Sequence, residues 1–126
     1  MKARDTSQQS GFTLIEIIAV LLILAVLAAV AIPRYLNMVG QAEARAFEGA
    51  LATGYSHLSL IYAREALTAG TPPAASALAT AAGGANAPAG DYTYAFAADG
   101  TTGVEITVSK PGSTYTTNGV WRLPDA

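Results

Sequence analysis

The chain has 126 residues, which suits one small domain. Apolar residues make up 52% of it and charged residues 13%, whereas about a quarter of an ordinary soluble domain is charged, so the composition excludes that class for the chain as a whole. The formal net charge of −2 and the scattered basic residues give no indication of nucleic-acid binding, and the lack of cysteine excludes disulfides and thiolate metal sites.

The chain opens with a polar segment, residues 1–11, which carries Lys2 and Arg4. Residues 12–33 follow as an apolar block that ends at Pro33. The block is long enough to cross a bilayer, which takes about 20 residues. By the positive-inside rule, the basic residues before it predict that the amino terminus lies in the cytoplasm and the tail outside.

Three interpretations of the apolar block are open. The first is a plain membrane anchor. The second is a secretory signal peptide, because Ala29-Val30-Ala31 fits the small-x-small pattern of signal-peptidase sites, so that the mature chain would begin at Ile32. The third is an anchor whose leader is removed by a cut before the block.

Glu16 lies inside the apolar block and favours the third interpretation. A carboxylate there is costly, about 2.5–3.5 kcal/mol for the related Asp on insertion scales, and such residues need a partner. The block contains no Lys, Arg or His, so the nearest cation would be a new amino terminus made by a cut between Gly11 and Phe12. That amine has a pKa of about 8 and is mostly protonated at neutral pH. If the partner is the Phe12 amine of a neighbouring copy, the pair would set the register of an assembly.

Residues 34–67 have the pattern of an amphipathic helix that continues the apolar block. Apolar residues recur at steps of three and four, the spacing of one helix face; they include Leu36, Val39, Phe47, Leu51, Leu58 and Ile61. Arg45 and Glu48 are spaced for a surface ion pair. Gly49 and Gly54 each weaken a helix by about 1 kcal/mol relative to Ala, which indicates close packing or local flexibility.

The rest of the chain divides into a loop and a sheet region. Residues 68–90 are rich in Ala, Gly, Pro and Thr and are expected to form a loop with little intrinsic order. Residues 91–126 alternate in a way that predicts a three-stranded antiparallel meander; the apolar positions are Tyr92, Tyr94, Phe96, Val104, Ile106, Val108, Val120, Trp121 and Leu123. Turns are expected at Asp99-Gly100, Pro111-Gly112 and Asn118-Gly119.

The run Gly-Phe-Thr-Leu-Ile-Glu from Gly11 to Glu16, joined to the apolar block and Pro33, resembles the type IV prepilin cleavage motif. The resemblance implies that a prepilin peptidase cuts after Gly11, the last residue of the leader 1–11, and N-methylates Phe12. It implies an assembly role for Glu16, which stands where the family has its glutamate. It also implies one for Pro33, where many type IV pilins have a proline that should kink or locally melt the helix.

The same resemblance implies an α+β pilin fold, in which a long N-terminal helix packs on a small antiparallel sheet. The hydrophobic half of the helix is expected in the membrane or in a filament core. The chain is then a structural subunit and not an enzyme, with no cofactor and no metal. It lacks the cysteine pair of many major pilins, so the C-terminal region must hold by packing and hydrogen bonds, or by its neighbours.

The partners that the resemblance implies are the prepilin peptidase, an inner-membrane assembly platform, the membrane before assembly, and further copies of the chain in a homopolymeric helical filament. Nucleic acid is not among them. The precursor is expected in the bacterial inner membrane, and the mature chain in an extracellular pilus or a periplasmic pseudopilus.

The type of filament is open among three classes. A type IV pilus for adhesion, motility or surface attachment is favoured, because residues 33–37 and the following helix loosely resemble the mannose-sensitive haemagglutinin class of pilins. A type II secretion pseudopilin is the first alternative, but the acids here lack the close ligand spacing of its usual calcium site. A conductive filament is the second, although aromatics along the helix are more simply explained by packing. His57, the single histidine, is expected to be a surface or packing residue.

Overall fold

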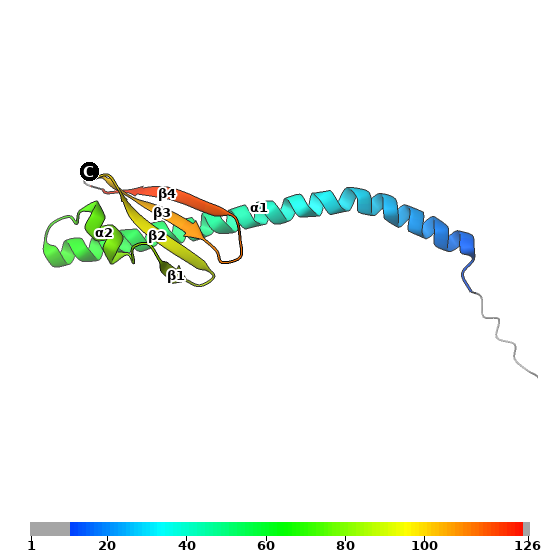
Figure 1. Cartoon of the computed structure of the whole chain (residues 1–126), viewed down its shortest axis with the longest axis horizontal. Helices are drawn as coiled ribbons and strands as arrows, with labels where there is room; N and C mark the ends of the chain where they lie inside the picture. Colours follow the sequence, from blue (N-terminus) through cyan, green and yellow to red (C-terminus); the bar gives the residue numbers. More distant parts are fainter. Residues whose placement is uncertain (1–10, 125–126) are drawn as a thin grey trace, which may run out of the picture. The chain divides into compact units, whose positions relative to one another are not determined.

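The computed structural model describes residues 11–124, so the predicted leader lies outside the described residues except for Gly11. The described residues form two helices and one four-stranded antiparallel sheet, in the order α1, α2, β1, β2, β3, β4 (Figure 1). This is the α+β fold that was predicted, a long N-terminal helix and a small antiparallel sheet.

The chain divides into two compact units, residues 1–40 and 41–126, and helix α1 (Leu14–Ala69) contributes to both. In the first unit, α1 continues through Pro33 without interruption. Because proline has no amide hydrogen, it leaves the carbonyl four residues before it without its helical donor. Because α1 is continuous at Pro33, the local melting is not present in the single chain, although one hydrogen bond of the ladder is missing there; the kink, which was the other predicted effect, stays a prediction.

The sheet of the second unit has the strand order β1-β2-β3-β4. Its strands are β1 (Ala87–Ala89), β2 (Tyr92–Asp99), β3 (Gly103–Ser109) and β4 (Thr116–Arg122), each antiparallel to its neighbour. Every second residue of a strand points to the same face. On β3 this alternation sends Val104, Ile106 and Val108 into the core, and all three are fully buried. The alternation seen in the sequence is thus confirmed for the central strands.

The core lies between the sheet, the second part of α1, and α2 (Ala75–Ala81). Its buried residues come from these three elements and from Ala82, the residue that follows α2: Phe47, Ala50, Leu58, Ala75, Leu78, Ala79, Ala82, Tyr94, Phe96, Val104, Ile106 and Val108. Ring contacts add to the packing between helix and sheet, since Phe47 meets Tyr92 and Tyr115 edge-on at centroid distances of 5.2 and 4.9 Å. Trp121 is partly buried, and its Nε1 donates to Ser59 Oγ at 3.1 Å.

Segment 68–90 is more ordered than its composition predicts, because it contains α2 and β1. Alanine has the highest helix propensity, so the alanines around Leu78 form a helix once that side chain is buried in the core. The expectation of little order was wrong because it gave the glycines and prolines of this segment more weight than the alanines. Pro88 is tolerated in β1 because this is an edge strand.

Two of the three predicted turns are present. Gly100 and Gly112 take φ values of 63° and 84°, which glycine adopts without steric cost. The turn expected at Asn118-Gly119 was wrong, because both residues lie inside β4. The missing Cβ of Gly119 makes room for the ring of Tyr55, which packs directly on this strand, so the glycine serves packing rather than a turn.

The predicted stripe of the amphipathic helix is correct in its second part. Phe47 and Leu58 are fully buried, and two further members, Leu51 and Ile61, pack on the core. The remaining members, Leu36 and Val39, belong to the first unit and stay exposed; these two assignments were wrong.

The predicted surface pair is present, since Arg45 donates to Glu48 at 2.8 Å. The hydrogen bond and charge of Glu48 raise the pKa of Arg45 above its ordinary value. The pair is exposed, so it contributes little to stability.

Candidate processing and assembly site

Helix α1 begins with a reciprocal pair of side-chain hydrogen bonds. The Thr13 amide donates to Glu16 Oε2 at 3.1 Å, and the Glu16 amide donates to Thr13 Oγ1 at 3.3 Å. This is a capping box, in which the residue before the helix and the third helical residue satisfy each other's amides. It fixes the start of the helix at Leu14 and leaves residues 11–13 outside it.

The capping box gives Glu16 a partner within its own chain. A carboxylate in the first turn is also favoured by the positive end of the helix dipole. Its second oxygen, Oε1, has no hydrogen-bond partner among the described residues. The carboxylate can therefore keep its cap and still accept a further donor.

The role of Thr13 at this site was not predicted from the sequence. The signal was present, because Thr-x-x-Glu before an apolar run is the sequence signature of a capping box. A capping residue is useful in any helix, whether it belongs to an anchor, a signal peptide or a chain with a cleaved leader. The presence of Glu16 is therefore weaker evidence for a cleaved leader than the cost of its charge indicated.

The proposed cleavage point lies just before this cap. Gly11 and Phe12 are both outside the helix, and the Phe12 side chain is 84% exposed. A peptide bond outside a helix takes no part in the helical hydrogen-bond ladder. The Gly11–Phe12 bond is thus open to an enzyme at the position where the sequence predicts the cut.

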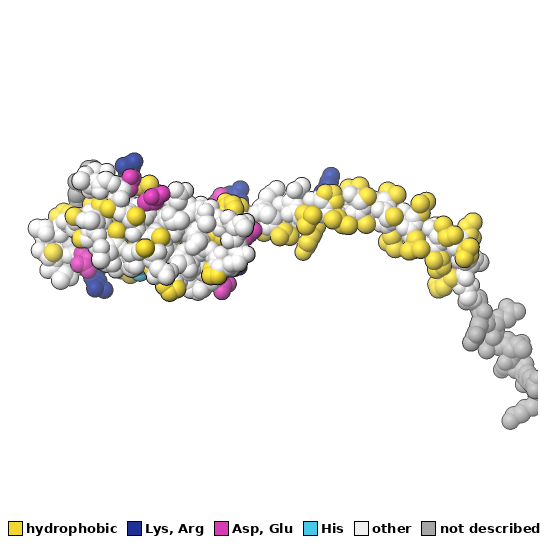
Figure 2. Space-filling model, viewed as in Figure 1, with side chains coloured by type: hydrophobic (Ala, Val, Ile, Leu, Met, Phe, Trp, Pro, Cys, Tyr) yellow, Lys and Arg dark blue, Asp and Glu magenta, His cyan; other side chains and the backbone are white. Residues whose placement is uncertain are grey.

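The helix that follows the cap presents apolar side chains all round. Every residue from 14 to 32 is exposed, and Figure 2 shows the hydrophobic side chains covering this part of α1. By length and composition α1 is able to cross a membrane, and none of its most apolar stretch is buried within the protein. A helix that is apolar on all sides needs lipid or protein around it.

A comparison with protein families identifies a known motif in this segment. The model of the prokaryotic N-terminal methylation motif matches residues 6–32. The chain carries the N-terminal motif of the type IV pilin and pseudopilin family. The matched range includes Gly11, Phe12 and Glu16, and it ends one residue before Pro33. Comparisons with curated proteins and with solved structures found no match.

The motif supports the type IV pilin and pseudopilin class, whose members are structural subunits. The motif implies processing by a prepilin peptidase and assembly into a filament, and with the apolar helix it fits a membrane-anchored precursor. The match favours the third interpretation of the apolar block, a cleaved leader, over a signal peptide and a plain anchor. The closeness to haemagglutinin-type pilins stays a prediction.

Other candidate groups in the described part of the chain are isolated. Residues 11–124 hold no cluster of three or more His, Asp or Glu side chains able to bind a metal ion. His57 lies exposed on α1, with its ring 6.0 Å from that of Phe96.

Proposed function

We propose that this chain is a pilin, the structural subunit of a type IV pilus that serves adhesion, motility or surface attachment. The observation that carries the proposal is the union of two features in one segment. A cleavage and methylation motif leads directly into a helix whose apolar side chains are exposed on every side. Such a helix suits a subunit that is held first by lipid and later by other copies of itself.

Processing would act on the open segment before the cap. The prepilin peptidase cuts after Gly11, removes the leader 1–11, and methylates the amine of Phe12. Two of the chain's basic residues, Lys2 and Arg4, leave with the leader. The mature chain then begins one residue before Thr13, so its new positive charge lies beside the capping box.

Assembly would use the free oxygen of Glu16. Oε2 stays on the Thr13 amide while Oε1 accepts the Phe12 amine of an adjacent copy. Among apolar helices an unpaired charge is strongly disfavoured, so this pair would fix the register of neighbouring subunits. Pro33 would allow α1 to bend or unwind locally as it leaves the lipid, because one hydrogen bond of its ladder is already missing.

The parts of the chain then have distinct roles in the filament. Residues 12–33 form the transmembrane and assembly helix, and residues 34–67 form the amphipathic helix under the sheet. Residues 68–90, which contain α2 and the edge strand β1, connect α1 to the other strands of the sheet, and these strands lie in the sheet region 91–126. The inner-membrane assembly platform would act on the first of these parts.

A pseudopilin of type II secretion is the second candidate, since the matched motif is common to both classes. A conductive filament is a third. The aromatic rings of α1 pack against rings of the sheet, as Phe47 does with Tyr92 and Tyr62 with Trp121, and this supports a packing role for them.

The N-terminal sequence and mass of the chain recovered from sheared cell surfaces test the proposal. A chain that begins at N-methylated Phe12 and is abundant in surface fibres supports a pilus. The same terminus on protein confined to the periplasm would indicate a pseudopilin instead. A chain that begins at Ile32 would mean signal-peptidase cleavage and would overturn both.

A further inference from the structure

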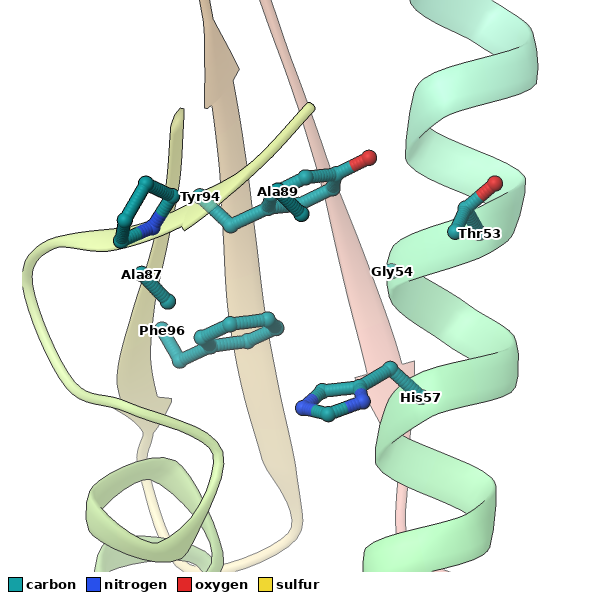
Figure 3. A pocket seen from close by; sticks show the side chains of 8 residues that line it. Thr53, Gly54, His57, Ala87, Ala89, Tyr94 and Phe96 are labelled. Carbon is teal, nitrogen blue, oxygen red and sulfur yellow. The ribbon is translucent and has the colours of Figure 1, made fainter. Parts of the chain in front are cut away.

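A recess of about 160 Å³ opens in the second unit between α1 and the β1 edge of the sheet (Figure 3). The rings of Tyr94 and Phe96 form its wall on β2 and lie nearly parallel, with an interplanar angle of 8°. The small side chains of Ala87 and Ala89 line the β1 side, and His57 projects from α1 toward Phe96. A buried apolar cavity of about 150 Å³ accepts benzene, so this recess has room for one aromatic ring.

His57 gives this apolar recess an unused polar group. Its imidazole takes part in no hydrogen bond among the described residues. The other polar groups on the lining are engaged, since the Tyr94 hydroxyl donates to the Ala50 carbonyl and the Thr53 hydroxyl to the Gly49 carbonyl, both at 3.1 Å. An occupant with a flat apolar body and one hydroxyl would satisfy both the aromatic wall and His57.

One exposed side chain of the second unit has this chemistry. The large hydrophobic residues exposed on its described part are Leu60, Leu67, Tyr115 and Val120. The aliphatic ones offer nothing to an imidazole, whereas Tyr115 offers a ring and a hydroxyl that has no partner among the described residues. In its own copy, Tyr115 packs edge-on against Phe47. Phe47 precedes Thr53 on α1 by about 9 Å at the rise of a helix, and Tyr115 does not line the recess of its own copy.

We propose that the recess receives the exposed edge of Tyr115 from a second copy, with the phenol hydroxyl donating to His57. The recess lies at the β1 edge of the sheet, and Tyr115 directly precedes β4 at the other edge. A contact between two different surfaces of identical copies leaves one of each surface free, so it propagates an open chain instead of closing a dimer. Tyrosine is one of the residue types that most often anchor interfaces.

This proposal rests on the proposed function, because it assigns a contact between the second units of neighbouring subunits in the filament. The chain has no cysteine, which makes cross-linking unambiguous. In filaments of the double variant Thr53→Cys, Thr114→Cys, a short bifunctional thiol reagent should give a ladder of covalent multimers on a denaturing gel. This variant keeps His57 and Tyr115, and it places one thiol on the lining of the recess and the other beside Tyr115. Each single variant should give no ladder.

A rival occupant is tested in the same way. The pair Thr53→Cys and Thr68→Cys reports insertion of Leu67, the most exposed leucine of the second unit, because Thr68 follows it in the chain. A ladder from this pair and none from the pair Thr53→Cys and Thr114→Cys would overturn the assignment of Tyr115. If the double variants do not assemble, coexpressed single variants replace them, and a covalent dimer from Thr53→Cys with Thr114→Cys is then the expected product.

Filling the recess tests the contact without altering Tyr115. Ala89→Leu should reduce filament yield at least about tenfold, as the loss of an interface anchor does. Ala98→Leu is the matched control, because Ala98 is also an exposed alanine of the sheet but does not line the recess, and its yield should be unchanged. Equal yields from the two variants would contradict the proposal.

The outcomes separate the two proposals. Filaments of subunits that begin at Phe12, with neither a cross-link from the pair Thr53→Cys and Thr114→Cys nor an effect of Ala89→Leu, would overturn the contact and leave the pilin function standing. If the unaltered chain is recovered with Ile32 as its first residue, the function itself falls, and the contact falls with it.

Discussion

At the scale of single residues, Glu16 combines a structural and an electrostatic task that one pair of variants can separate. Glu16→Gln keeps an oxygen to accept the Thr13 amide but removes the charge, whereas Glu16→Ala removes both. We expect both precursors to insert and to be cleaved, and neither to form filaments. The reason is that both variants leave the Phe12 amine of the adjacent copy without its partner, and an uncompensated charge buried between helices costs about 3–5 kcal/mol. The measurement is the amount of membrane-bound precursor, mature chain and sheared fibre.

Normal filaments from Glu16→Gln would show that the cap, and not the charge, is what assembly needs. The pairing with the Phe12 amine would then be wrong. Thr13→Ser is the control that retains a hydroxyl at the cap, and it should behave like the unaltered chain.

Tyr94 makes the stability of the second unit sensitive to alkaline pH. Burial raises its pKa above the ordinary value near 10, so the folded chain keeps this proton to higher pH than the unfolded chain does. Its contribution is therefore complete below about pH 10 and is lost as the pH rises through the folded pKa. Tyr94→Phe should weaken this alkaline loss. At neutral pH it should cost about 0.5–1.5 kcal/mol, because the hydrogen bond to the Ala50 carbonyl is gone.

Denaturant midpoints of the mature chain in detergent, at neutral and alkaline pH, measure both effects. Tyr35→Phe is the control, because Tyr35 is 68% exposed in the first unit. If the two variants lose stability equally at alkaline pH, the sensitivity does not come from Tyr94.

At the scale of elements, two glycines of α1 differ in whether they pack against the sheet. Gly54 is buried, and a Cβ there would lie 3.1 Å from Ile106 Cγ2 and 3.4 Å from the Tyr94 ring. A Cβ at Gly49 would meet nothing within 4 Å. Gly49→Ala should therefore stabilise the chain by about 0.5–1 kcal/mol through helix propensity. Gly54→Leu should destabilise it by about 1–3 kcal/mol or more, because it overpacks the core.

Thermal melting of the two variants beside the unaltered chain measures the difference. Equal shifts of the two midpoints would mean that α1 does not press on the sheet at Gly54. The sequence predicted that the glycines mark either close packing or flexibility, and the structure assigns close packing to Gly54 alone.

Elements whose apolar residues alternate clearly with polar ones were predictable from the sequence, and an element made mostly of alanine was not. The alternation of Val104, Ile106 and Val108 identifies β3, because every second residue of a strand faces the core. Helix α2 buries Ala75, Leu78 and Ala79 at helical spacing, but alanines also stand at its exposed positions, so the sequence does not show which face is buried. The same limit applies to Gly119, which looks like a turn residue until Tyr55 is known to pack on it.

At the scale of the whole molecule, the N-terminal motif could be recognised from the sequence and the recess could not. Gly11, Phe12 and Glu16 lie within a contiguous motif, and residues 6–32 match the family model. The recess is built from three elements that the sequence does not bring together. Of its polar residues, His57 had been expected to be a surface or packing residue.

The division into two units predicts that the second folds without the first. Every residue of the hydrophobic core lies between Phe47 and Val108, within residues 41–126. A fragment that begins at Gln41 should therefore be soluble without detergent and melt cooperatively, whereas the mature chain from Phe12 should need lipid or detergent. Circular dichroism and amide-proton dispersion of the fragment check this. A fragment that orders only when lipid is added would mean that the apolar helix is needed for the fold as well as for assembly.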